Sequence, residues 1–256
     1  MSAPSQLTEA NGRHRVIVRS PNPLGDACMS LPAVRALKQR RPDTEITVCC
    51  RDNLTAMWAT RDEIDEVIPF KKGLKPREVG RIIRKHGRFD EGLLLPNSFR
   101  SALELRLGGV NKLTGYKRYG RGLLLKNAVR ESEARDDKVH HVHRYLHLAE
   151  AMGADISDLE DLLAIPPAPA PIDSGLTELH IGVCPGAEYG NAKRYPIDRY
   201  AKALQTLRGN HPEATFRISV FGSPAEEGIG DELAGLLDEP RTVSYTHLTL
   251  PTIRLV

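Results

Sequence analysis

The chain has 256 residues and a formal net charge of +3, with 40% hydrophobic and 27% charged residues. This composition is typical of a globular protein with a buried core and argues against a disordered or fibrous chain. Basic and acidic residues are mixed along the sequence. Because no zinc knuckle, helix-turn-helix pattern or basic–aromatic platform occurs, nucleic acid is not expected as a partner.

The amino terminus and the cysteines give no sign of export or of a membrane span. The first fourteen residues are polar, and no run reaches the roughly 20 apolar residues that a spanning helix needs. The four cysteines, Cys28, Cys49, Cys50 and Cys184, lack the paired spacing of a metal site. We therefore expect a cytoplasmic protein with reduced thiols and no bound metal.

The first half of the chain alternates short apolar runs with amphipathic stretches, which predicts a parallel β-sheet with helices on both faces. The predicted strands are 15–19, 45–50, 66–70, 89–95 and 112–116, and the predicted helices are 26–40, from 53 onward, 75–86, 97–107 with Asn97 as N-cap, and 139–152. The residues expected on the inner face of the first helix are Met29, Leu31, Val34 and Leu37.

Asp26 follows the first predicted strand and a turn-rich loop, at the point where the first helix begins. In open α/β sheets, ligands bind beyond the carboxyl ends of the strands. Asp26 is therefore a candidate general base that would accept a proton from an acceptor hydroxyl. The alternative interpretation is that its side chain only caps the helix.

Two polar clusters come next along the chain. The basic residues Lys112, Lys117, Arg118 and Arg121 are interleaved with Tyr116 and Tyr119, and this set suits an acidic acceptor or, equally well, a solvated surface. A second cluster, His140, His141, His143 and Arg144, invites the hypothesis of a metal site. Adjacent histidines on a helix point in different directions, so the polar start of a helix is the favoured interpretation.

Four prolines in the ten residues from Ala164 to Asp173 predict an extended linker over 164–175. The alternation then restarts, with strands at 179–184 and 216–221, helices at 197–209 and from 225, and another strand expected after Pro240. The predicted domains are 1–163 and 176–242. Val243 to Thr252 resembles one reading frame of a sequencing adapter, so we expect residues 243–256 to be foreign to the natural protein and the second domain to be incomplete.

The loop from Pro185 to Pro196 lies between a predicted strand and a predicted helix. Free backbone N–H groups, the positive end of a helix dipole and a lysine suit a phosphate or pyrophosphate; the alternative is a structural loop with surface cations. The candidate phosphate ligands are Gly186, Ala187, Glu188 and Lys193. After the next strand, Ser223 and Glu226 are candidates for contacts with a nucleotide, although an ordinary helix start explains them equally well.

Several of these segments together resemble glycosyltransferase family 9, the heptosyltransferases, and most closely its heptosyltransferase II group. The segments that carry the resemblance are Asn22–Asp26, Leu95–Ala102, Thr114–Tyr116 with Arg121–Leu124, and Pro185–Glu188 with Ala192–Pro196. The resemblance covers most of residues 15–242, and its specificity comes from the order and spacing of the motifs.

The resemblance implies an α/β protein of the GT-B type, with two Rossmann-like domains. The amino domain would hold the lipid-linked lipopolysaccharide inner-core acceptor, and the carboxyl domain would hold ADP-heptose. Asp26 would be the base of an inverting transfer, and Lys193 would stabilise the departing ADP without a metal or other cofactor. The acceptor ligands implied are Asn97, Ser98, Arg100, Tyr116 and Arg121. The enzyme would work as a peripheral protein at the cytoplasmic face of the inner membrane.

Alternative functions stay open at this point. Within the same class, the acceptor could be that of heptosyltransferase I or a related core glycosyltransferase. The family's later Asn-Asp-Ser-Gly motif has no counterpart after Val243, so an inactive fragment that binds the acceptor alone is a second possibility. A third is an unrelated nucleotide-binding module that would bind ADP and ignore the core oligosaccharide.

Overall fold

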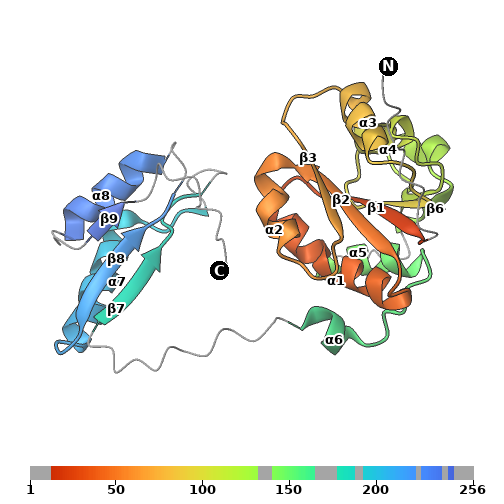
Figure 1. Ribbon diagram of the computed structural model, residues 1–256. Coiled ribbons are helices and arrows are strands. Elements are labelled where there is room, and N and C mark those ends of the chain that lie inside the picture. The colour runs from red at the N-terminus through yellow and green to blue at the C-terminus, as the bar shows by residue number, and fades with distance from the viewer. Residues whose placement is uncertain are drawn as a thin grey trace, which may run out of the picture. The chain divides into compact units, whose positions relative to one another are not determined.

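The computed structural model describes residues 13–131, 140–164, 178–187, 193–222, 226–237 and 242–244. The chain divides into two compact units, residues 1–165 and 166–256 (Figure 1). The predicted linker, 164–175, contains the division, and its residues from 165 onward lie outside the described residues. None of the helices in the described ranges is long and apolar enough to cross a membrane.

The described part of the larger unit contains a six-stranded parallel sheet with the order β3-β2-β1-β4-β5-β6. The strands are β1 (Arg15–Arg19), β2 (Glu45–Arg51), β3 (Glu66–Phe70), β4 (Glu91–Leu94), β5 (Leu113–Tyr116) and β6 (Asn127–Val129). Strand order runs outward in both directions from the β1–β4 pair, in which Val18 is in register with Leu93. The carboxyl ends of these two strands therefore form the topological switch point of the sheet.

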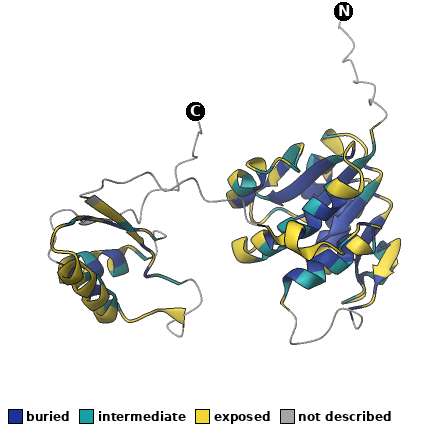
Figure 2. Cartoon of the chain, turned by 90° about the horizontal axis from the view of Figure 1, so that it is seen from below, coloured by how far each residue is buried: buried dark blue, intermediate teal, exposed yellow. Residues whose placement is uncertain are grey.

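Helices cover both faces of this sheet (Figure 2). They are α1 (Leu24–Arg40), α2 (Thr55–Ala59), α3 (Pro76–Lys85), α4 (Phe99–Leu107), α5 (Val142–Glu150) and α6 (Leu159–Leu163), with the short 3-10 turns η1 (Asp52–Leu54) and η2 (Arg121–Leu124). Side chains alternate along each strand. In β1, Val16 and Val18 join the core under α1 and α5, whereas Ile17 joins the core under α3 and α4.

Two glycine-mediated contacts bring α3 and α4 close together on the second face. A Cβ on Gly80 would lie 2.8 Å from the backbone carbon of Leu107, and one on Gly108 would lie 2.7 Å from the side chain of Ile83. The absence of these methyl groups lets the two helices pack side by side. Together with η2, whose last residue Leu124 and the following Leu125 pack into the same core, they form one layer over the sheet.

The described part of the smaller unit contains a three-stranded parallel sheet, β7-β8-β9, with two helices that contact each other. Its elements are β7 (Glu178–Val183), α7 (Ile197–Asn210), β8 (Thr215–Val220), α8 (Glu227–Leu237) and β9 (Thr242–Ser244). Its core gathers residues such as Val183, Ala201, Ile218 and Leu233. The strand expected after Pro240 is present, and the residues from 245 onward lie outside the described part.

The predicted parallel sheets in both halves are confirmed, with most element ends within two residues of the expected positions. One local prediction is wrong: Ser98, rather than Asn97, is the N-cap of α4, because its side chain accepts a hydrogen bond from the backbone N–H of Ser101. Three elements, β6, η2 and α6, were not predicted. Each is five residues or fewer, too short to show a clear hydrophobic period.

Candidate active site

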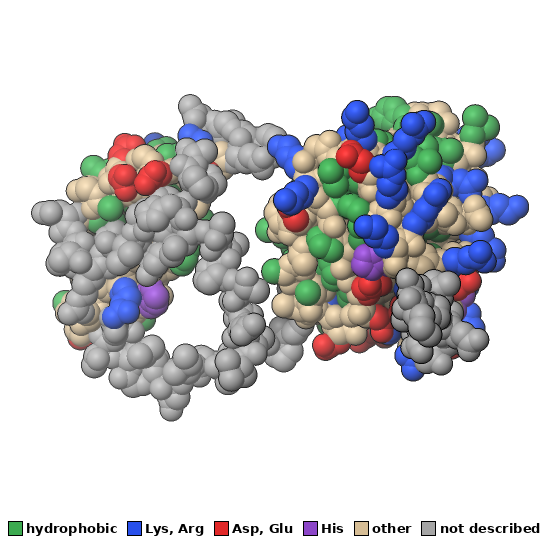
Figure 3. Space-filling model, turned by 45° about the horizontal axis from the view of Figure 1, so that its top comes forward, with side chains coloured by type: hydrophobic (Ala, Val, Ile, Leu, Met, Phe, Trp, Pro, Cys, Tyr) green, Lys and Arg blue, Asp and Glu red, His purple; other side chains and the backbone are tan. Residues whose placement is uncertain are grey.

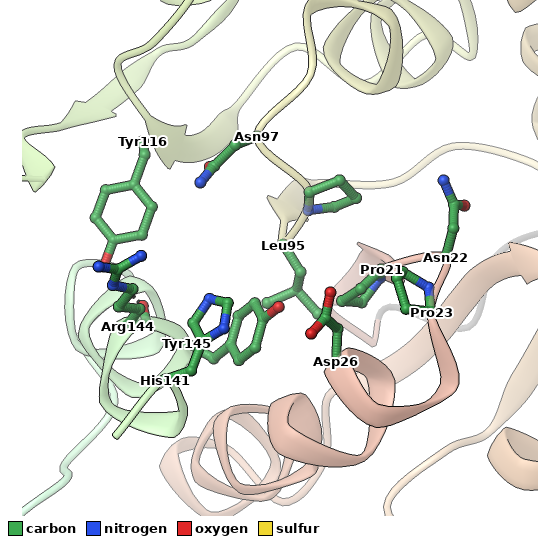
Figure 4. Close-up of a pocket in the computed structure, with 11 residues that line it drawn as sticks. Pro21, Asn22, Pro23, Asp26, Leu95, Asn97, Tyr116, His141, Arg144 and Tyr145 are labelled. Atoms are coloured by element: carbon green, nitrogen blue, oxygen red, sulfur yellow. Dashed lines mark hydrogen bonds between the residues drawn. The ribbon is translucent and has the colours of Figure 1, made fainter. Parts of the chain in front are cut away.

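A cavity of about 260 Å³ opens at the switch point of the larger sheet. Its walls come from the loop after β1, the loop after β4, the end of β5 and the first turn of α5 (Figure 4). We call it the Asp26 pocket; it is lined by Pro21, Asn22, Pro23, Asp26, Leu95, Pro96, Asn97, Tyr116, His141, Arg144 and Tyr145. It combines one carboxylate with aromatic and hydrogen-bonding groups.

Asp26 lies in the first turn of α1, and its half-buried side chain faces the pocket (Figure 4). The N-cap position belongs to Pro23, so the interpretation of Asp26 as a helix cap is wrong. Within the described ranges its carboxylate makes no hydrogen bond or ion pair. Asp26 therefore presents a carboxylate with free acceptor capacity to the cavity.

The α5 wall is built from His141, Arg144 and Tyr145, which follow the i, i+3, i+4 spacing of one helix face. The His141 ring stacks on Tyr145, with centroids 5.1 Å apart and an interplanar angle of 16°. Burial, and after it the charge of Asp26, raises the pKa of the Tyr145 phenol. Tyr145 is therefore a neutral hydrogen-bond donor beside Asp26.

The sequence motifs give no role to Tyr145, and they indicate a metal site or the polar start of a helix for His141 and Arg144. The helical spacing of these three residues, 141, 144 and 145, was the signal that could have found the wall. Among the described residues no group of three or more histidines, cysteines or carboxylates is placed to hold a metal ion.

The opposite wall depends on Tyr116 and Arg121. The Tyr116 hydroxyl donates a hydrogen bond of 2.7 Å to the carbonyl of Arg144, which ties β5 to α5. Arg121 has 0% exposure, and its guanidinium donates to the carbonyls of Tyr116 (2.7 Å) and Pro96 (2.5 Å) and to Oδ1 of Asn97 (3.0 Å). Burial lowers the pKa of Arg121 to about 10.

Arg121 was predicted to touch the acceptor or to lie on a solvated face. The structure instead makes it a clamp that holds the pocket loops together, because its donors are used by protein oxygens. Asn97 and Tyr116, also predicted as acceptor ligands, do line the Asp26 pocket.

A second, smaller cavity of about 100 Å³ shares Asn22 and Pro96 with the first. We call it the cationic pocket; its lining includes Arg19, Arg51, Lys72, Ser98, Arg100, Ser101 and Glu104. Glu104 has 1% exposure and is held by Arg19 at 2.9 Å and Arg100 at 3.0 Å. In the described part of the chain, Arg51 and Lys72 have no carboxylate partner, so the cavity has an excess of positive charge.

The predicted acceptor ligands Ser98 and Arg100 line this second cavity and not the Asp26 pocket. The structure thus divides four of the five predicted ligands between two adjoining cavities, and Arg121 lines neither of them but holds the loops of the first.

The predicted phosphate loop lies in the smaller unit, after β7. Gly186 lies against the carboxylate of Glu226, which an added Cβ would strike. This contact brings together residues that follow β7 and β8. Lys193 is exposed, and Arg194 donates to the Ala187 carbonyl at 3.4 Å. Glu188 and Ser223 lie outside the described residues.

Comparison with known proteins decides the family. The model of glycosyltransferase family 9 (heptosyltransferase) matches residues 77–253, more than half of the chain. The chain belongs to this family. Among family members, lipopolysaccharide heptosyltransferase 2 of Escherichia coli is 31% identical over 249 residues, which cover 88% of this chain and 68% of that protein. Lipooligosaccharide heptosyltransferase 2 of Haemophilus ducreyi is 30% identical, over 86% of this chain and 66% of that one.

Solved structures of the family have the same fold. The E. coli ADP-heptose lipopolysaccharide heptosyltransferase II superposes with a TM-score of 0.67 at 27% identity, over 90% of this chain and 72% of that one. A family 9 glycosyltransferase from Veillonella parvula gives a TM-score of 0.70 at 18% identity, over 90% and 69%. The predicted fold class, α/β of the GT-B type, is confirmed. The chain spans about two thirds of the length of the curated relatives it matches.

Proposed function

We propose that this glycosyltransferase transfers heptose from ADP-heptose to a heptosylated acceptor of the lipopolysaccharide inner core. The names of its relatives at about 30% identity, lipopolysaccharide and lipooligosaccharide heptosyltransferase 2, support this substrate pair. The observation that carries the chemistry is Asp26, a carboxylate with free acceptor capacity in a cavity at the switch point of the sheet.

In the proposed reaction, Asp26 accepts the proton of an acceptor hydroxyl while the oxygen of that hydroxyl attacks the anomeric carbon of the donor heptose. A new carbon–oxygen bond forms at that carbon while the bond to the ADP phosphate oxygen breaks, so the configuration inverts. Tyr145 would donate a hydrogen bond to the sugar or to Asp26, since its phenol stays protonated.

The cationic pocket supports an acidic acceptor. Arg51 and Lys72 would bind a carboxylate or phosphate group, next to the Asp26 pocket that would hold the reacting hydroxyl. Buried Arg19 and Glu104 would keep the shape of this site without changing its net charge, because they neutralise each other.

For the donor, we propose that Lys193 and the backbone of Gly186 and Ala187 bind the diphosphate, and that Glu226 contacts the ribose. Glu188 and Ser223 complete the proposed set. The charge that develops on the departing ADP would be stabilised by Lys193 and by the amino terminus of α7, with no metal ion required.

The test is acceptor-dependent release of ADP. The 256-residue chain is incubated with ADP-heptose and either a heptosylated inner-core oligosaccharide or the same oligosaccharide without heptose, and ADP is measured with a coupled enzyme. We expect ADP to be released with the heptosylated acceptor and not with the acceptor that lacks heptose. Equal release without any acceptor would contradict the proposal, and preference for the unheptosylated acceptor would favour the specificity of heptosyltransferase I. Calorimetry with ADP tests the alternative of an inactive fragment, because a chain that binds only the acceptor would not bind ADP.

The role of Asp26 is tested by Asp26→Asn, which keeps the shape of the side chain and removes its basicity. We expect kcat to fall by about 10²–10⁴-fold, with the thermal midpoint unchanged because the carboxylate makes no described contact. Asp43→Asn is the matched control, since this carboxylate is 63% exposed in the loop between α1 and β2. Full activity of Asp26→Asn would exclude Asp26 as the base.

A further inference from the structure

Glu131 is a buried carboxylate to which the proposed reaction gives no role. It follows β6 by two residues and is 9% exposed. Its Oε1 atom is covered by protein and makes no hydrogen bond. Because removal of a carboxylate from water is costly unless cations lie close to it, the groups around Glu131 indicate what it does.

Two arginines from different elements surround this carboxylate. Many Lys and Arg side chains of the larger unit stand at its surface (Figure 3), but those of Arg118 and Arg144 are only 32% and 28% exposed. Arg118, two residues after β5, pairs through Nε with Oε2 of Glu131. Arg144, in the first turn of α5, places Nη1 3.7 Å from Oε1. Glu131 therefore links the ends of β5 and β6 to α5.

The two ion pairs differ in closeness, and the difference matters for Arg144. Arg118 pairs closely with Oε2, whereas the 3.7 Å between Nη1 of Arg144 and Oε1 is too long for a hydrogen bond. Among the described residues, no protein oxygen accepts a hydrogen bond from the Arg144 guanidinium. Attraction to Glu131 therefore restrains this guanidinium and leaves its N–H groups available to a ligand.

Arg144 lines the Asp26 pocket, whereas Glu131 does not. The Tyr116 hydroxyl holds the backbone carbonyl of Arg144, so the side chain is the part whose position depends on Glu131. In Figure 4, Tyr145 lies between Arg144 and Asp26. An acceptor sugar that places one hydroxyl at Asp26 would therefore present other oxygen atoms toward Arg144.

The charge of Glu131 acts at the pocket wall itself. Burial, and after it this charge, raises the pKa of the Tyr116 phenol, and the charge of Arg144 opposes the rise. Tyr116 therefore stays protonated and keeps its hydrogen bond to the Arg144 carbonyl. The backbone of Arg144 is held by Tyr116, and its side chain is held by Glu131.

We propose that Glu131 is a positioning residue for the acceptor: its carboxylate holds the Arg144 guanidinium in the wall of the Asp26 pocket, where Arg144 donates hydrogen bonds to oxygen atoms of the acceptor sugar. The planar, rigid set of guanidinium donors suits this task. The alternative is that Glu131 only ties β5, β6 and α5 together. This inference rests on the proposed function, because it assigns acceptor binding to the pocket of the proposed base.

Steady-state kinetics of the 256-residue chain distinguish the two roles. Glu131→Gln keeps the shape of the side chain and removes its charge. We expect KM for the heptosylated inner-core oligosaccharide to rise about tenfold, as for the loss of one charge-assisted hydrogen bond. The value of kcat should stay within about twofold of the parent value, because only binding that is equal in ground state and transition state is lost.

Arg144→Gln tests the same contact from its other end. It should raise KM for the acceptor at least as much as Glu131→Gln does. In the Arg144→Gln background, Glu131→Gln should add no further change, since a positioning residue has no effect once the group that it positions is absent. An unchanged KM in Arg144→Gln would overturn the proposal, even if Glu131→Gln failed to fold.

Arg118→Gln separates positioning from a purely structural role. It removes the closer ion pair of Glu131 but no residue of the pocket lining, so KM for the acceptor should stay within about twofold of the parent value. Glu150→Gln is the matched control, since this carboxylate is exposed at the end of the same helix, α5; neither KM nor kcat should change. Equal rises of KM in Glu131→Gln and Arg118→Gln would overturn the proposal.

A second measurement does not depend on transfer. The NMR order parameter of the Arg144 Nε–H bond reports how firmly the guanidinium is held, and it should fall in Glu131→Gln and not in Glu150→Gln. An unchanged order parameter in Glu131→Gln would overturn the positioning.

The outcome is separable from that of the proposed function. Absence of transfer by the parent chain would refute the proposed function, and the order parameter of Arg144 would then decide the positioning by itself. Intact transfer by the parent chain, with the same KM for the acceptor in Glu131→Gln, would refute the positioning alone.

Discussion

The two adjoining cavities at the carboxyl edge of the larger sheet each contain a carboxylate, and the structure uses the two in opposite ways. Asp26 is half-buried, makes no described ion pair and faces a cavity lined by aromatic rings. Glu104 has 1% exposure and is bonded to Arg19 and Arg100. The residue type is nearly the same, but pairing commits Glu104 to the structure and leaves Asp26 available for proton transfer.

Removal of the structural carboxylate is expected to have the largest effect on stability. Glu104→Ala leaves the buried Arg19 without its partner, and we expect a loss of about 3–5 kcal/mol in the free energy of unfolding, measured by urea denaturation. Arg100→Ala is the control, because the Arg100 side chain is 53% exposed and its pair should contribute less than about 1 kcal/mol. Equal losses in the two variants would remove the distinction between a structural and an available carboxylate.

Arg121 extends the comparison to a buried charge that has no carboxylate partner among the described residues. Its replacement by methionine leaves the carbonyls of Tyr116 and Pro96 without their donor, and we expect a loss of about 3 kcal/mol in unfolding free energy. Lys117→Met, at an exposed neighbour, should change stability by no more than about 0.5 kcal/mol. If Arg121→Met unfolded no more easily than Lys117→Met, the clamp would have no energetic role.

The cysteines show the same contrast between buried and exposed groups, and the effect expected from them is the smallest, a difference in thiol reactivity. Cys28 and Cys184 are exposed, and Cys49 and Cys50 are buried; desolvation raises the pKa of Cys49 to about 12 and that of Cys50 to about 11. At pH 8 we expect iodoacetamide to label Cys28 and Cys184 in the folded chain and all four thiols after denaturation, as measured by mass spectrometry.

The same shifts set a pH dependence of stability. Above about pH 9 the unfolded chain releases the two buried thiol protons while the folded chain keeps them, so their contribution favours unfolding as the pH rises toward 11–12. Cys49→Ala should reduce the loss of stability at alkaline pH. Rapid labelling of Cys49 in the folded state would contradict its burial.

The sequence predicted those features of the fold that local patterns determine. The run Arg15–Arg19 and the apolar residues of the first helix, Val34 and Leu37 among them, occupy the strand and the buried helix face expected for them. Asp26 could be singled out because the first turn after a strand leads to the binding edge of an α/β sheet. The N-cap of α4 was misplaced by one residue, since Asn97 and Ser98 are both good caps and their backbone conformation is not written in the sequence.

The remainder depended on contacts between distant parts of the chain. His141 and Tyr145 join the Asp26 pocket only because strand order brings α5 beside α1. The burial of Arg121 likewise depends on where β4 and β5 end, and nothing in its neighbours along the chain separates it from exposed Lys117.

The amino-acid sequence by itself determined the alternation of strands and helices, the family resemblance and the position of the candidate base. These follow from the spacing of apolar residues and from short motifs, both of which act within a few turns of chain. Only the tertiary structure decided which charged groups are paired, buried or open to a cavity. Solvation and pairing depend on neighbours in space, and those neighbours are set by the packing of the whole sheet.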